Sequence, residues 1–60
     1  MLTIATAKAY AEKITQGAAT YARLMSVDGA AMIQVRVRMP DFHIYWVDCW
    51  LEAGRVYGEY

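Results

Sequence analysis

Residues 31–39 alternate between two classes of side chain, and this alternation constrains the fold more than any other feature of the chain. The odd-numbered positions of this segment are all apolar, whereas Gln34, Arg36 and Arg38 occupy even-numbered positions. A period of two is that of a β-strand, whose successive side chains point to opposite faces. The segment is therefore predicted to be a half-buried strand.

Two further strands are expected after this one. The dipeptide Pro40-Asp41 marks a turn, because proline cannot donate to a sheet ladder. Residues Phe42–Glu52 are rich in aromatic and β-branched side chains, which favour strands. Ala53-Gly54 is expected to be a tight hairpin loop, and Arg55–Tyr60 is expected to return as a short final strand.

The first part of the chain has helical periodicity. Thr3 is suited to the N-cap, because its hydroxyl can accept a backbone N–H of the first turn. Since most residues as far as Met25 are good helix formers, a helix over Thr3–Met25 is predicted, ended by Asp28-Gly29. The apolar side chains that recur every three or four residues are Ile4, Ala7, Ala11, Ile14, Ala18, Tyr21 and Met25.

Gly17 leaves a second interpretation open, because glycine is also typical of the residue just past the end of a helix. In that case Tyr21–Val27 becomes a strand, and Asp28-Gly29 is the two-residue hairpin turn that follows it. The sequence thus predicts one α+β domain over residues 1–60. Its N-terminal helix packs on one face of a three-stranded antiparallel meander, or, in the alternative, a shorter helix packs on four strands.

The strand Phe42–Glu52 is apolar on both faces, so its pairing decides which face meets the helix. A three-residue turn at 39–41 and a two-residue loop at 53–54 both group aliphatic side chains on the odd-numbered face, which we assign to the core. A one-residue slip at Pro40 would reverse the first of these pairings. The expected pairs are Val37 with His43, Val35 with Tyr45, Ile33 with Val47 and Leu51 with Val56.

The even-numbered face is then the candidate functional surface, and it places Asp48 opposite Glu59. Like charges directly opposite one another destabilise a sheet, so this pairing suits a surface for a basic partner better than it suits stability. Tryptophans set among acids are typical of an interface hot spot. The predicted partner-binding residues are Trp46, Asp48, Trp50, Glu52, Tyr57 and Glu59.

The net charge of zero, from six basic and six acidic residues, disfavours a simple nucleic-acid binder. It is a cancellation, because residues 1–38 hold five basic and two acidic residues and residues 39–60 hold one and four. A single cysteine cannot form a disulfide within the chain. One cysteine and one histidine also provide too few ligands to close a four-ligand zinc site. His43 and Cys49 are expected about 20 Å apart on one strand, too far for a catalytic dyad. No enzyme activity, catalytic residue, cofactor or metal is therefore predicted.

Three functions are compatible with these features. The first is a non-enzymatic protein that binds a basic surface of a protein partner through the outer sheet face. The second is a small nucleic-acid-binding module that uses Arg23, Arg36 and Arg38. The third is a structural homodimer with the outer faces packed together. No signal peptide or bilayer-spanning run is recognised, so a cytoplasmic location without membrane association is expected.

The chain resembles small phage-encoded anti-CRISPR proteins in its length, its single Cys49 and its acidic-aromatic surface of Trp46, Asp48, Trp50, Glu52 and Glu59. The resemblance implies a stoichiometric inhibitor that occupies the DNA-binding surface of a CRISPR effector complex, such as a type I complex, in the cytoplasm of a host bacterium. Zero net charge departs from the strongly acidic DNA mimics of this kind, so the resemblance implies a local acidic patch.

Overall fold

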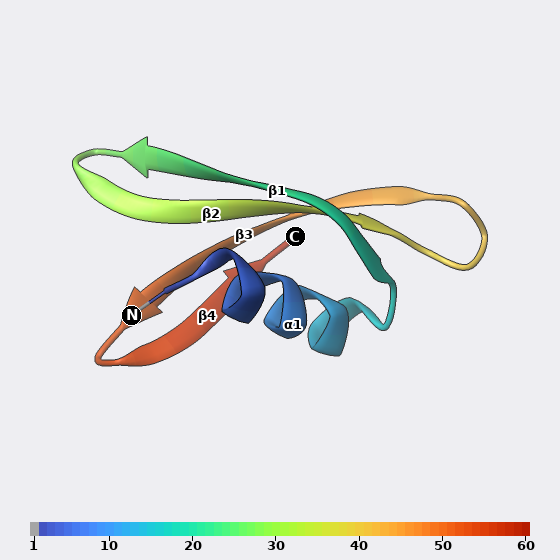
Figure 1. The fold of residues 1–60 in the computed structure, drawn as a ribbon, viewed down its shortest axis with the longest axis horizontal. Helices are drawn as coiled ribbons and strands as arrows, with labels where there is room; N and C mark the ends of the chain where they lie inside the picture. The colour runs from blue at the N-terminus through green and yellow to red at the C-terminus, as the bar shows by residue number, and fades with distance from the viewer. Residues whose placement is uncertain (1) are drawn as a thin grey trace.

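The computed structural model describes residues 2–60, which form one helix and one antiparallel sheet. The strands lie in the sheet in chain order, β1-β2-β3-β4, and α1 lies across one face of the sheet (Figure 1). The expected α+β class is confirmed, and the alternative with a shorter helix and four strands fits. The prediction of a helix that continues to Met25 is wrong, because α1 ends at Thr15. The elements are α1 (Ile4–Thr15), β1 (Ala18–Val27), β2 (Ala30–Arg38), β3 (Ile44–Glu52) and β4 (Arg55–Glu59).

At each end of α1 a local hydrogen bond satisfies a backbone N–H group. Thr3 is the N-cap, as expected, and its Oγ1 accepts the N–H of Thr6 at 3.1 Å. At the other end Gln16 adopts a left-handed conformation with φ of 62°, and its N–H donates to the carbonyl of Glu12. The left-handed residue at this end is thus the C-cap Gln16, and Gly17, which the alternative interpretation placed just past a shorter helix, directly follows it.

Gly17 is required for a close approach between the end of α1 and β2. A Cβ at this position would lie 2.5 Å from Cγ1 of Val37 and 2.9 Å from the carbonyl oxygen of Arg38. The missing side chain lets the backbone pass against β2 as it leaves the helix and enters β1. The glycine therefore marks the end of the helix through packing.

Residues 18–27 form β1 although most of them favour helices when isolated. Helix propensities of ordinary residues differ by only a few tenths of a kcal/mol, which the pairing of β1 with β2 outweighs. Asp28 and Gly29 have φ values of 51° and 80°, and a type I′ hairpin turn requires two such positive values. Ala53 and Gly54 repeat the same turn between β3 and β4, with φ values of 52° and 76°.

β2 and β3 pair two residues away from the expected register. The turn between them is longer than expected, because the N–H of Phe42 donates to the carbonyl of Met39 and the N–H of Met39 donates to the carbonyl of His43. Phe42 and His43 therefore precede β3. Since the shift is an even number of residues, each side chain keeps its expected face. The observed pairs include Val37–Tyr45, Val35–Val47 and Ile33–Cys49, while Leu51–Val56 is paired as expected.

The core lies between α1 and the odd-numbered face of β2 and β3, as expected. The alanines of the helix stripe let its backbone lie close to the sheet, and Tyr10 covers Gly58 of β4 where a Cβ would lie 2.8 Å from its ring. A helix of 12 residues spans only about 18 Å, so it leaves part of this inner face open, and Leu24 on β1 is 69% exposed. The buried apolar residues are Ala7, Ala11, Ile33, Val35, Val37, Val47 and Cys49.

Candidate binding surface on the outer face of the sheet

All six predicted partner-binding residues lie on the sheet face that α1 leaves uncovered, which we call the outer face. The strand register places them there: those of β3 alternate with the buried Val47 and Cys49, and Tyr57 and Glu59 of β4 pair with Trp50 and Asp48. The outer face also carries residues of β1, which the preferred sequence interpretation had placed in a helix. Among its residues are Tyr21, Arg23 and Met25 of β1, Met32, Gln34, Arg36 and Arg38 of β2, Ile44, Trp46, Asp48, Trp50 and Glu52 of β3, and Arg55, Tyr57 and Glu59 of β4.

The acidic half of this face consists of the outer-face residues of β3 and β4 and contains the expected pairing of Asp48 with Glu59. Trp50 and Tyr57 pair beside them with stacked rings, 6.3 Å between centroids. Among residues 2–60, the contact within 4 Å between an acidic and a basic side chain is that of Asp41 with His43. The two opposed carboxylates are therefore not neutralised by a direct salt bridge within the described chain.

A relay of side chains supports one of these two carboxylates from the neighbouring strands. Oδ1 of Asp48 accepts a hydrogen bond from Nε2 of Gln34 at 3.1 Å. Oε1 of Gln34 in turn accepts two hydrogen bonds from Arg23, at 2.7 and 3.0 Å. The amide thus links Arg23 to Asp48, while none of these hydrogen bonds reaches Glu59.

The two hairpins of the sheet diverge (Figure 1), and a cleft lies next to the pair of Asp48 and Glu59. The pairing of β2 with β3 stops at Ile33 and Cys49, so residues 30–32 and 50–52 belong to their own hairpins and do not pair with each other. The cleft has a volume of about 370 Å³ and both carboxylates contribute to its wall. It is lined by Val27, Ala30, Ala31, Met32, Asp48, Trp50, Leu51 and Glu59.

The arginine half consists of the outer-face residues of β1 and β2. Two of its guanidinium groups lie over aromatic rings. The guanidinium of Arg23 lies 5.6 Å from the centre of the Trp46 ring, and that of Arg36 lies 5.5 Å from the Tyr21 ring. Tyr21 meets Trp46 edge to face at 6.4 Å. Trp46 thus belongs to β3 of the acidic half, but its ring contacts Arg23 and Tyr21 of β1.

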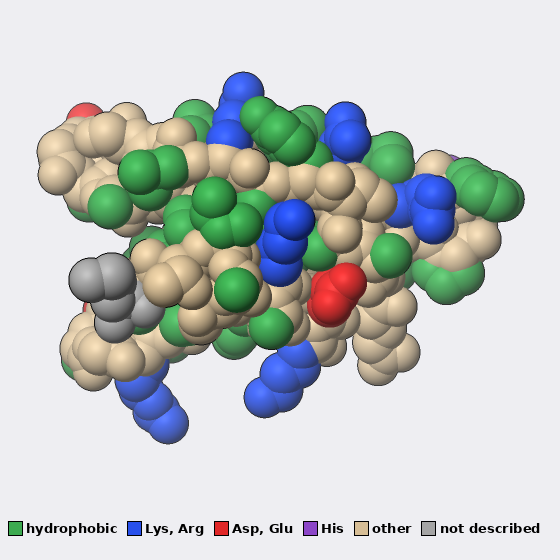
Figure 2. Space-filling view, in the orientation of Figure 1, with side chains coloured by type: hydrophobic (Ala, Val, Ile, Leu, Met, Phe, Trp, Pro, Cys, Tyr) green, Lys and Arg blue, Asp and Glu red, His purple; other side chains and the backbone are tan. Residues whose placement is uncertain are grey.

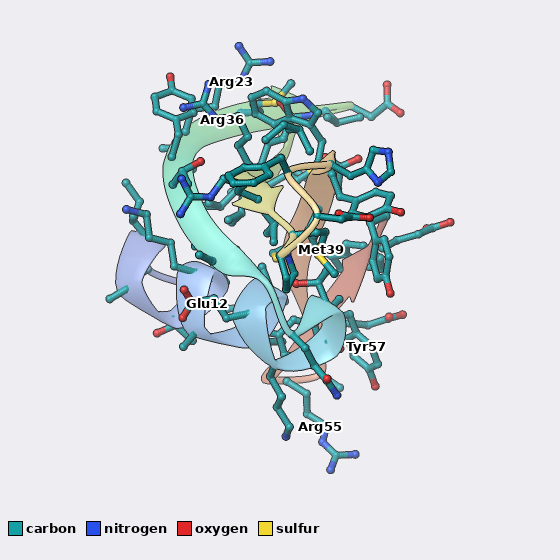
Figure 3. The ribbon with its side chains drawn as sticks, turned by 90° about the vertical axis from the view of Figure 1, so that its right-hand side faces the viewer. Glu12, Arg23, Arg36, Met39, Arg55 and Tyr57 are labelled. Carbon is teal, nitrogen blue, oxygen red and sulfur yellow. The ribbon has the colours of Figure 1, made fainter. Side chains whose placement is uncertain are left out.

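The outer face is bipolar as a result. Figure 3 shows Arg23 and Arg36 together at one end of the molecule, with Tyr57 and Arg55 at the other. Figure 2 shows Lys and Arg side chains alternating with exposed hydrophobic ones along the side formed by β1. The charge difference between the two parts of the sequence thus becomes a difference between two halves of one surface, since the sheet has the strands in chain order.

In the described part of the chain, Cys49 and His43 form no further site. Cys49 is buried, its Sγ lies 3.8 Å from the carbonyl oxygen of Ala7, and burial raises the pKa of its thiol, with a further contribution from Asp48. His43 lies in the turn before β3, where its Nδ1 is 2.7 Å from Oδ2 of Asp41. Within residues 2–60 no three His, Cys, Asp or Glu side chains cluster as a metal site would require.

The sequence predicted the acidic half of the surface but missed the contribution of β1. Arg23 and Tyr21 were placed on a helix, so their contacts with Gln34 and Trp46 were not foreseen. Asp28-Gly29 was the signal that could have found them, because a hairpin turn there puts Tyr21 and Arg23 on the same sheet face as Arg36. No pattern in the sequence predicted the cleft, because the cleft depends on where the pairing of β2 with β3 stops.

Comparison with known proteins supplies no relative for this arrangement. No protein-family model, curated protein or solved structure matches the chain. In residues 2–60 no helix combines the length and the apolar character needed to cross a membrane. The resemblance to anti-CRISPR proteins stays a prediction.

Proposed function

We propose that the protein is a non-enzymatic binding protein whose acidic half holds a basic segment of a protein partner. The observation that carries the proposal is the direct opposition of Asp48 and Glu59 at the wall of an apolar cleft. Two carboxylates so placed accept hydrogen bonds from one cation that approaches between them, and charge-assisted bonds of this kind are the stronger ones in proteins.

The lining of the cleft defines the chemistry of that cation. Its walls include Met32, Trp50 and Leu51, which suit the methylene stem of a long side chain. The Trp50 ring also offers a face for a cation–π contact. An arginine of the partner, with several N–H donors and an apolar stem, matches both the walls and the carboxylates. The DNA-binding surface of a CRISPR effector complex, the partner implied by the sequence resemblance, is one basic surface of this class.

The experiment is calorimetric titration of the protein with a hexa-arginine peptide at low salt, with a hexa-glutamate peptide as the counterpart. The arginine peptide is expected to bind and the glutamate peptide is not. The affinity for the arginine peptide is expected to fall as the salt concentration rises. The isosteric variant Asp48→Asn/Glu59→Gln should bind at least about tenfold more weakly, because both acceptors lose their charge.

The matched control is Asp41→Asn, which removes one carboxylate from the turn between β2 and β3, away from the cleft-lining residues. It should bind the peptide as the unsubstituted protein does, and circular dichroism should show that all variants are folded. Equal affinity of the double variant and the unsubstituted protein would overturn the proposal. So would binding of a single-stranded oligonucleotide through Arg23, Arg36 and Arg38 with no binding of the peptide.

A further inference from the structure

We infer that the outer face is self-complementary and that two copies of the chain pack these faces together about a twofold axis parallel to the strands. The inference begins with the layout of charge. Three arginines and no acid lie on the outer face of β1 and β2, whereas Asp48, Glu52 and Glu59 lie with Arg55 on that of β3 and β4. A surface with one half basic and one half acidic complements its own copy only in certain orientations.

A twofold axis in the plane between the outer faces has two limiting orientations, along the strands and across them, and these have opposite electrostatic consequences. An axis that runs along the strands between β2 and β3 exchanges the two halves, so the arginine half covers the acidic half of the second copy. An axis that runs across the strands leaves each half over its own equivalent, so Arg23 meets Arg23 and Glu59 meets Glu59. Charge complementarity therefore selects the axis along the strands.

The register gives the contacts that this axis creates. Residues paired in one row of the sheet keep their row under the rotation, and Arg23, Gln34, Asp48 and Glu59 form a single row. Arg23 then faces Glu59 of the second copy, and Gln34 faces its Asp48. Two of the N–H groups of Arg23 already donate to Gln34, which leaves its other N–H groups for the carboxylate of Glu59.

The neighbouring rows bring apolar and aromatic side chains together in the same way. Arg36 comes over Trp46 of the second copy, an arrangement that suits a cation–π contact. On the other side of the charged row the pairing of β2 with β3 has ended, and there the Met25–Met32 pair of one copy lies toward the stacked Trp50 and Tyr57 of the other. The twist of sheets rotates aligned faces by about 30°, and the long side chains of Arg23 and Glu59 are able to span the resulting offset.

The available area sets the strength of the association. The molecule measures 34 × 18 × 16 Å, so one face offers at most about 600 Å² and a pair of faces about 1,200 Å². This area is at the lower limit of specific interfaces, which indicates a reversible dimer and not a permanent one. Trp46 and Tyr57, 41% and 37% exposed in the single chain, would be covered by it.

The dimer would also compete with the proposed partner for the acidic half. This competition is the one part of the inference that rests on the proposed function. Arg23 of the second copy occupies the position of the partner's cation at Glu59, so dimerisation and binding of a basic segment exclude each other. The free protein then keeps its binding face covered, and a partner has to displace the second copy.

The test is sedimentation velocity of the pure protein over a concentration series that spans the micromolar range. A monomer–dimer equilibrium is expected. The single variants Arg23→Glu and Glu59→Arg each place like charges at both symmetry-related contacts and should weaken the dimer at least about tenfold. An equimolar mixture of the two variants restores both contacts and should dimerise as the unsubstituted protein does.

The double variant Arg23→Glu/Glu59→Arg identifies the axis. About an axis along the strands it recreates both opposite-charge contacts within a homodimer, whereas about an axis across the strands it leaves like charges together. Recovery of the dimer in this variant is expected. The charge reversal Lys8→Glu, on α1, is the matched control and should not change association.

Three results would overturn the inference: a monomer at every concentration, single variants that dimerise like the unsubstituted protein, or a double variant that stays as weak as the singles. Circular dichroism of each variant separates these results from unfolding. Because no peptide is present, a failure here leaves the proposed binding of a basic segment intact, and a failure of the peptide titration leaves the dimer intact.

Discussion

The carboxylates of Asp48 and Glu59 belong to directly opposed residues of β3 and β4, and within residues 2–60 only that of Asp48 accepts a side-chain hydrogen bond. Opposed like charges lower the stability of a sheet, so this pair is a cost to the free monomer. The cost is offset when a cation lies between the carboxylates, and this links the instability of the site to its proposed use.

Replacement of Glu59 with glutamine is therefore expected to stabilise the monomer. The neutral amide removes the repulsion with Asp48 and should raise the free energy of unfolding by about 0.2–1 kcal/mol. Urea denaturation followed by circular dichroism, at protein concentrations low enough to avoid dimerisation, measures this change. Glu12→Gln is unsuitable as a control, since Oε2 of Glu12 accepts the N–H of Ala19. A loss of stability in Glu59→Gln would contradict the expectation.

Replacement of Gly17 with alanine is expected to destabilise the fold. The added Cβ would meet Val37 at 2.5 Å and the backbone carbonyl of Arg38 at 2.9 Å, and backbone atoms of a central strand cannot move away cheaply. A loss of about 1–3 kcal/mol is expected from overpacking of this kind. If Gly17 were only a flexible position, the same substitution would instead stabilise the protein by restricting the unfolded chain. Thermal unfolding of the two proteins separates these outcomes.

The sequence allowed the faces of the sheet to be predicted better than the extent of the helix. The side chains of β2 and β3 alternate with period two, so even a register error of two residues left Val35 and Cys49 inside and Asp48 outside. Residues 18–25 carry only weak helical preferences, and the pairing that overrides them involves β2, which lies elsewhere in the sequence. The acidic pair followed from local turn geometry, whereas the cleft and the relay through Gln34 followed from contacts between separate hairpins.

Replacement of Ala53 with asparagine is expected to stabilise the β3–β4 hairpin. Ala53 has a φ of 52°, a left-handed conformation that costs an alanine about 1–2 kcal/mol and an asparagine much less. An increase of about 0.5–1 kcal/mol in the free energy of unfolding is therefore predicted. Gly54→Ala serves as the opposite case, because its φ of 76° would strain any residue with a side chain. A stabilised Gly54→Ala variant would show that this turn does not hold the type I′ geometry.

The carboxyl of Asp41 is expected to titrate below its ordinary range. A hydrogen bond from the backbone N–H of His43 lowers its pKa most, and a second from the ring of His43 lowers it further. The stabilisation of the turn is thus present above the pKa of the unfolded chain and is lost as the pH falls through the lower pKa of the folded protein. Titration of the carboxyl carbon by NMR measures the shift. In His43→Ala the backbone bond persists, so only part of the shift should disappear; complete loss would contradict the order of the two causes.

Cys49 is expected to report on opening of the core. Burial raises the pKa of its thiol, and the nearby carboxylate of Asp48 raises it further, so the reactive thiolate is scarce in the folded chain. Labelling by a thiol-specific disulfide reagent at mildly alkaline pH should therefore be slow in the native protein and fast in denaturant. Its rate should follow the fraction unfolded, as circular dichroism reports it, because Cys49 lies beneath α1 with its Sγ 3.8 Å from the Ala7 carbonyl oxygen. The destabilised Gly17→Ala variant should label faster than the unsubstituted protein, and Ala53→Asn should label more slowly. Rapid labelling of the native protein, with no response to either substitution, would mean that α1 separates from the sheet without unfolding of the rest.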